Sequence, residues 1–172
     1  MQIVDKSKSK SRIHKHTIQS LIKELMSEDG VVRNSARFEL VKIGEPAIDF
    51  LAKLVNNSED HVRWEAIKTM GEIESPLSIP FLVDALVDEV SSVRWLAAEG
   101  LIALKNQGLK AVLEVLIERK KSFIMYQSVH HVLHDLNKEL KDSKITELIS
   151  LLESATEKFR IPGLAKEILD CM

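Results

Sequence analysis

One short segment carries four side chains that could bind a metal ion. His130, His131, His134 and Asp135 lie in the run HHVLHD, and the pairs His130–His134 and His131–Asp135 are each spaced four residues apart. On a helix this spacing places two side chains on one face, where both can bind the same ion. A complete site needs further ligands, and the sequence shows no obvious third or fourth one. These residues are weak metal candidates, and an ordinary structural role for them stays open.

Other signatures of catalysis are missing from the sequence. It contains no phosphate-binding glycine loop, no G-x-G-x-x-G and no G-x-S-x-G motif. The single cysteine, Cys171, is next to the last residue, a poor place to hold a nucleophile rigidly. We therefore expect no enzyme and no cofactor, with a lyase-like activity as the remaining alternative.

Large aromatic residues recur at intervals of 31 residues, at Trp64, Trp95 and Tyr126. At about 100° per helical residue, Trp64 points away from the apolar stripe of its own helix. Two interpretations stay open: a binding stripe, because Trp, Tyr and Arg dominate interaction hot spots, or rings packed on neighbouring helices. The two columns of this face form the predicted partner-binding set of Asn34, Phe38, Trp64, Lys68, Trp95, Glu99, Tyr126 and His130.

The aromatic spacing belongs to a longer repeat of about 31 residues. HVRWEAIKTMGEI at 61–73 matches SVRWLAAEGLIAL at 92–104, and IDFL at 48–51 matches IPFL at 79–82 at the same offset. Such a period is typical of stacked helical units, in which each helix pair covers the apolar stripe of the next. We expect a basic tail over 1–16 and a single domain over 17–172, with repeats at 17–44, 45–75, 76–107 and 108–139 and a degenerate pair at 140–172.

The pieces DHVR at 60–63, SVR at 92–94 and IPFLVDAL at 79–86 resemble HEAT repeats, specifically the short bacterial type of phycobilisome-lyase-like HEAT proteins. The resemblance implies an all-α fold, a right-handed α–α superhelix (a HEAT-like solenoid) of about four to five helix pairs. In that family the arginine of the Val-Arg pair and a preceding aspartate form a polar ladder between repeats. The resemblance carries this role to Arg33, Arg63 and Arg94, with Asp29 and Asp60 as partners.

Composition and charge narrow the classes of partner. The 172 residues are 45% hydrophobic and carry a formal net charge of −2. Residues 1–16 hold five basic residues and one acidic residue (+4), which leaves −6 for the remainder. An acidic body argues against nucleic acid as the partner. The apolar runs are too short to span a membrane and no signal peptide is present, so we expect a cytoplasmic protein.

Together these patterns predict a protein–protein interaction scaffold or adaptor. Its concave groove would hold a segment of a partner protein or peptide through the aromatic stripe. The alternative is a bilin-lyase-like or chaperone-like HEAT module, in which Trp64, Trp95 and Tyr126 would stack on a planar tetrapyrrole. A nucleic-acid-binding HEAT-like module is a third possibility, and the oligomeric state is left open.

Overall fold

The computed structural model describes residues 17–118 and 122–172, and within these ranges the regular structure is helical, without a strand. The expected basic tail, 1–16, lies outside the described residues. The chain is helical at 17–25. The helices that follow are α2 (Gly30–Ile43), α3 (Ile48–Leu51), α4 (Asp60–Ile73), α5 (Ile79–Ala85), α6 (Ser91–Ala103), α7 (Asn106–Glu118), α8 (Phe123–Leu140), α9 (Ser143–Glu153) and α10 (Ile161–Asp170). Short 3-10 turns, η1 (Glu45–Ala47), η2 (Pro76–Ser78) and η3 (Lys158–Arg160), precede α3, α5 and α10.

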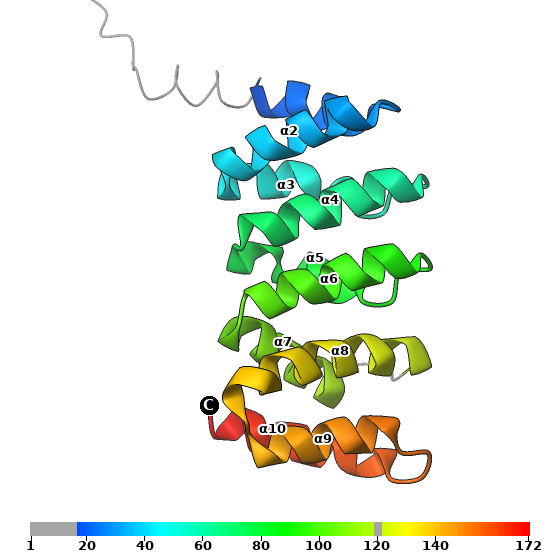
Figure 1. The fold of residues 1–172 in the computed structure, drawn as a ribbon, viewed down its shortest axis with the longest axis vertical. Helices are drawn as coiled ribbons and strands as arrows, with labels where there is room; N and C mark the ends of the chain where they lie inside the picture. Colours follow the sequence, from blue (N-terminus) through cyan, green and yellow to red (C-terminus); the bar gives the residue numbers. More distant parts are fainter. Residues whose placement is uncertain (1–16, 119–121) are drawn as a thin grey trace, which may run out of the picture.

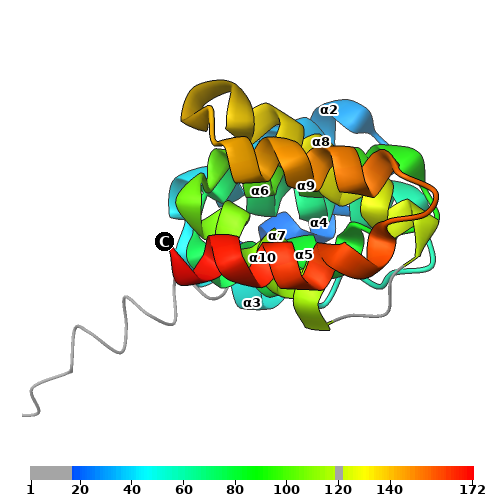
Figure 2. The ribbon, with the colours of Figure 1, turned by 90° about the horizontal axis from the view of Figure 1, so that it is seen from below.

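Successive helix pairs stack along the long axis of the molecule (Figure 1). The helices thereby form two layers that both run along this axis. The second helix of each pair packs on the second helix of the next, in the order α2, α4, α6 and α8. We call these four helices the second-helix layer. The first helices α3, α5 and α7 lie together on the other side (Figure 2). The predicted all-α helical superhelix is therefore confirmed.

The last helix pair exchanges its layers. Here α9, the first helix of the pair, packs on α8, whereas α10 packs on α7 (Figure 2). Only Lys141 and Asp142 separate α8 from α9, and Lys141 takes the left-handed conformation with φ of 53°. Asn137 then donates to the Asp142 carbonyl at 3.2 Å and to the Thr146 hydroxyl at 2.9 Å. This tight turn folds α9 back along α8 and leaves the end of the other layer to α10.

The predicted apolar stripe forms the contact between the layers. Val62, Ala66 and Met70 are fully buried, and their equivalents one repeat later, Val93, Ala97 and Leu101, are buried as well. Gly71 of α4 and Gly100 of α6, which are not repeat equivalents, bring the backbones of the two second helices together, since a Cβ on Gly71 would lie 3.2 Å from the Gly100 Cα. Small residues at this crossing let the second helices pack at close range.

Candidate partner-binding surface on the second helices

The two tryptophans of the predicted stripe differ in exposure. Trp95 on α6 is 56% exposed, and its indole stacks on the His131 ring of α8 with centroids 4.3 Å apart. Trp64 on α4 is partly buried against the core. The Arg37 guanidinium lies 5.9 Å and the Lys68 ammonium 5.4 Å from the Trp64 ring centroid. Each ring therefore contacts a neighbouring helix, Trp95 is still widely accessible, and the binding stripe stays a prediction.

Tyr126 is not part of an exposed row, contrary to its predicted place in the partner-binding set. It is only 7% exposed, and burial raises the pKa of its phenol. The Lys158 ammonium lies 4.9 Å from its ring centroid. Lys158 belongs to η3, which follows α9, so the exchanged last pair contributes the group that covers this aromatic residue.

The remaining predicted residues mix exposed and paired side chains. Phe38 is 61% exposed, with the Lys42 ammonium 4.0 Å from its ring centroid, and Asn34 is exposed next to it. Further along the layer, ionisable side chains pair with each other. The three pairs are Lys68 with Glu72 at 3.3 Å, Glu99 with His131 at 2.9 Å and His130 with Glu153 at 2.8 Å.

A pocket of about 380 Å³ opens beside Trp95, between α4 and α6. Its walls include Lys68, Glu72 and Glu99, so charges of both signs surround the indole. Further along the layer, between α8 and the last pair, a second pocket of about 480 Å³ is lined by Phe123, Tyr126, His130, Glu153 and Lys158 among others. Each of these two pockets thus has an aromatic side chain in its wall.

The four histidine-cluster residues do not converge on one point. His131 turns toward Glu99 on α6, whereas His130 turns toward Glu153 on α9. The rings of His130 and His134 stack with centroids 6.0 Å apart, and Asp135 pairs with Lys138. Among residues 17–118 and 122–172, these side chains form no group of three with metal-binding distances. Within the cluster, His130 and His131 contact neighbouring helices, whereas His134 and Asp135 contact residues of α8 itself.

The ladder arginines share one contact that the sequence did not reveal. Each guanidinium donates to the two backbone carbonyls that lie six and five residues before it, in the turn that precedes its helix. Arg33 reaches residues 27 and 28 at 2.8 and 2.9 Å. Arg63 reaches residues 57 and 58 at 2.9 and 3.3 Å. Arg94 reaches residues 88 and 89 at 2.7 and 3.0 Å. The Val-Arg pair therefore fixes the turn between the two helices of each repeat.

The partners predicted for the ladder are wrong, although two of the arginines do join neighbouring repeats. Asp29 accepts from the N–H of residue 31 at 2.8 Å, and Asp60 accepts from the N–H of residue 61 at 2.7 Å. Both aspartates are used at the start of a helix, where backbone N–H groups lack partners within the helix. Arg33 instead pairs with Glu65 in the next repeat at 3.1 Å, and Arg37 joins the same carboxylate at 2.6 Å.

Arg63 makes the most complete link between repeats. Its Nε and Nη2 donate to the two carboxylate oxygens of Asp88 at 2.9 and 3.1 Å, and Nη2 also reaches Glu89 at 3.1 Å. Burial on its own would raise the pKa of Asp88. Hydrogen bonds from Arg63 and from the Val90 N–H, together with the charges of Arg63 and Arg94, outweigh burial and hold this pKa below its ordinary value.

A sequence profile described as HEAT repeats matches residues 18–102 of the chain. These residues are HEAT repeats. The resemblance to HEAT repeats read from the DHVR and SVR pieces is therefore confirmed. No curated protein sequence matches the chain significantly.

Two solved structures are similar to this chain. The complex of CpcE and CpcF of phycocyanin lyase from Nostoc sp. PCC7120 is similar over 88% of this chain and 97% of that chain, with 23% identity and a TM-score of 0.60. An engineered protein matches over 86% of this chain and 76% of its own, with 19% identity and a TM-score of 0.44. The first likeness establishes that this chain shares the fold of a phycocyanin lyase component.

The HEAT repeats support the broad expectation of a protein-interaction scaffold. In the described part of the chain, no helix has the length and apolar character needed to cross a membrane.

Proposed function

We propose that this protein is a scaffold that binds a partner protein along its second-helix layer, with Trp95 as the central anchor. The observation that carries the proposal is the exposure of Trp95, 56% in a chain with only two tryptophans. An exposed tryptophan is costly to leave in water, and tryptophan is strongly enriched among residues that dominate binding energy.

The surroundings of Trp95 suit an interface that is apolar at its centre and polar at its rim. The pocket beside the indole places Lys68, Glu72 and Glu99 around it, and Phe38 is exposed two helices away in the same layer. Interfaces commonly combine an aromatic centre with polar side chains that fix orientation. We infer a partner segment that inserts an apolar side chain beside Trp95 and carries charges of both signs around it.

The experiment compares the partner captured by the wild-type protein with that captured by two variants. Trp95→Ala should weaken binding of the captured partner at least about tenfold, since a central anchor is worth about 2 kcal/mol or more. Leu77→Ala is the matched control, because Leu77 is also a large exposed side chain (58%) but lies in η2, before a first helix.

The two variants also separate binding from folding. We expect both to melt close to the wild-type temperature, because both side chains are largely exposed. Full binding by Trp95→Ala, or equal losses in the two variants, would refute the anchor.

A lyase-like module is the second candidate, and the likeness to the phycocyanin lyase component favours it. That protein is seen as a complex of CpcE and CpcF, which itself suggests a protein partner for this chain. Stacking of a tetrapyrrole on Trp64, Trp95 and Tyr126 together has less support, because Tyr126 is buried and Trp64 is covered in part by Arg37 and Lys68. Addition of a bilin tests this candidate, since a shifted visible absorbance band that Trp95→Ala abolishes would favour it over the scaffold.

A further inference from the structure

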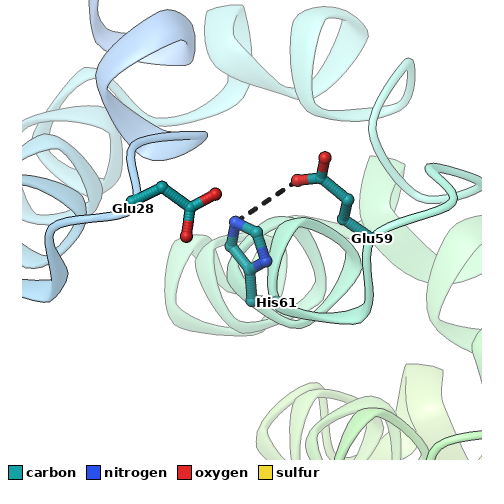
Figure 3. Close-up of side chains that lie close together, drawn as sticks. All are labelled: Glu28, Glu59 and His61. Atoms are coloured by element: carbon teal, nitrogen blue, oxygen red, sulfur yellow. Dashed lines mark ion pairs between the residues drawn. The ribbon is translucent and has the colours of Figure 1, made fainter.

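Three side chains at the junction of the first two repeats point toward one another. Glu28 lies in the turn before α2, Glu59 is the residue just before α4, and His61 lies in the first turn of α4 (Figure 3). One ligand atom from each residue lies within 4.8 Å of the other two. His61 Nε2 and a Glu59 carboxylate oxygen are 3.6 Å apart, which is within ion-pair distance.

The imidazole of His61 has a nitrogen that its surroundings do not satisfy. Nε2 is shielded from solvent and makes no hydrogen bond, although the ring as a whole is partly exposed. A buried polar atom without a partner costs free energy, and such groups are uncommon in folded proteins. This nitrogen faces the two carboxylates (Figure 3), so a cation between them would give it a partner.

We propose that Glu28, Glu59 and His61 bind one divalent transition-metal ion, with Zn²⁺ the best match. Zinc binds imidazole nitrogen and carboxylate oxygen at about 2.0–2.2 Å, which places two ligands of a tetrahedral site about 3.4 Å apart. The observed 3.6 Å is close to this separation, and both glutamates are exposed and free to move the rest of the way. Mg²⁺ and Ca²⁺ fit less well, because these ions prefer oxygen ligands throughout.

The backbone around each ligand is already held in place. The carbonyl of Glu28 accepts from Arg33 at 2.9 Å, and the N–H of Glu59 donates to Asn57 at 2.9 Å. The N–H of His61 donates to the Asp60 carboxylate at 2.7 Å. Ligands on a fixed backbone lose less freedom when the ion binds, and a metal at this position would join the turns of two successive repeats.

The repeat itself explains why the site occurs at one junction. Glu28 and Glu59 are 31 residues apart and occupy the same place in successive repeats. One repeat further, the places of Glu59 and His61 are taken by Val90 and Ser92, neither of which is a ligand of this kind. The proposed ligand set therefore belongs to the first junction and is not repeated at the second.

The test is calorimetric titration of Zn²⁺ into the full chain after treatment with a chelator. We expect one equivalent to bind and the melting temperature to rise with zinc concentration. Glu28→Gln should weaken binding at least tenfold while the metal-free protein melts as the wild type does, because Glu28 is exposed. His61→Ala should remove this binding event.

His134→Ala provides the matched control, because His134 belongs to the other histidine cluster and is exposed. It should bind zinc with wild-type affinity. Loss of zinc binding in His134→Ala with retention in His61→Ala would overturn the proposal, and so would a wild-type chain that binds no zinc. The visible spectrum with Co²⁺ in place of zinc gives a second readout, since the bands of a protein-bound ion should appear in the wild type and be absent from His61→Ala.

Discussion

Replacement of Arg63 by alanine should destabilise the protein more than replacement of the ladder arginine Arg94. The Arg63 side chain is 7% exposed and that of Asp88 is 10% exposed, so their pair is largely removed from water. Arg63 also holds two carbonyls in its own turn. Arg94 holds two such carbonyls as well, but it is only half-buried.

The size of the effect follows from what each substitution leaves behind. Removing one member of a buried ion pair costs about 3–5 kcal/mol, because the other charge stays buried without its partner. Asp88 would keep its hydrogen bond from the Val90 N–H, at 2.8 Å, so we expect about 3 kcal/mol for Arg63→Ala. Arg94→Ala removes two hydrogen bonds to backbone carbonyls and should cost about 1–2 kcal/mol.

Urea unfolding followed by circular dichroism measures these free energies. Arg63→Lys is the control for charge, because lysine keeps the positive charge but lacks the two-pronged geometry of the guanidinium. It should fall between the wild type and Arg63→Ala. In the double variant Arg63→Ala/Asp88→Ala no buried carboxylate is left without this partner, since Glu89 is exposed, so its cost should be smaller than the sum of the two single costs by about 1 kcal/mol or more.

Two results would refute this reasoning. Equal losses in Arg63→Ala and Arg94→Ala would mean that the link to Asp88 adds nothing to the contacts within the turn. Additive costs in the double variant would mean that the two side chains do not stabilise each other, whatever their distance.

Other substitutions give sharp contrasts. Gly108→Ala should destabilise the fold by about 3 kcal/mol or more, because its Cβ would lie 1.8 Å from the Leu101 carbonyl oxygen. Gly163→Ala in α10 should stabilise it by about 0.5–1 kcal/mol, since nothing lies within 4 Å of the added carbon; melting temperatures that fail to move in opposite directions would contradict both expectations. The lowered pKa of Asp88 means that its carboxylate stabilises the fold above its ordinary pKa of about 3.9, a contribution lost as the pH falls through the lowered value. The advantage of the wild type over Asp88→Asn should therefore shrink between about pH 5 and about pH 2, and a constant difference in unfolding free energy would contradict this.

The repeat period was sufficient to predict the layers and their apolar contact. Residues 31 apart take the same place in successive helices, so the burial of Val62 implied the burial of Val93 without any knowledge of the structure. The same rule failed at Tyr126. It assumes that each repeat is followed by another of the same kind, whereas α8 is followed by a pair in exchanged order.

The ladder partners could not be derived from local spacing. A guanidinium lies at the end of a long side chain, and Arg63 uses that length to reach the next repeat 25 residues away rather than Asp60 in its own turn. One signal was available, because Asp88 is the 31-residue equivalent of Asn57, and each of these side chains accepts from the N–H two residues later. Glu28 and Glu59 share a repeat place in the same way, but only the fold brings His61 between them.

The exchanged order of α9 and α10 also determines how this architecture can change in length. A duplicated 31-residue unit inserted between residues 75 and 76 would meet a second helix on one side and a first helix on the other, as the existing units do. A unit added after α10 would follow a helix in the first layer instead, so neither of its helices would meet the surface that its sequence is built to cover. The regular repeats can therefore be multiplied from within, whereas the exchanged pair interrupts their order.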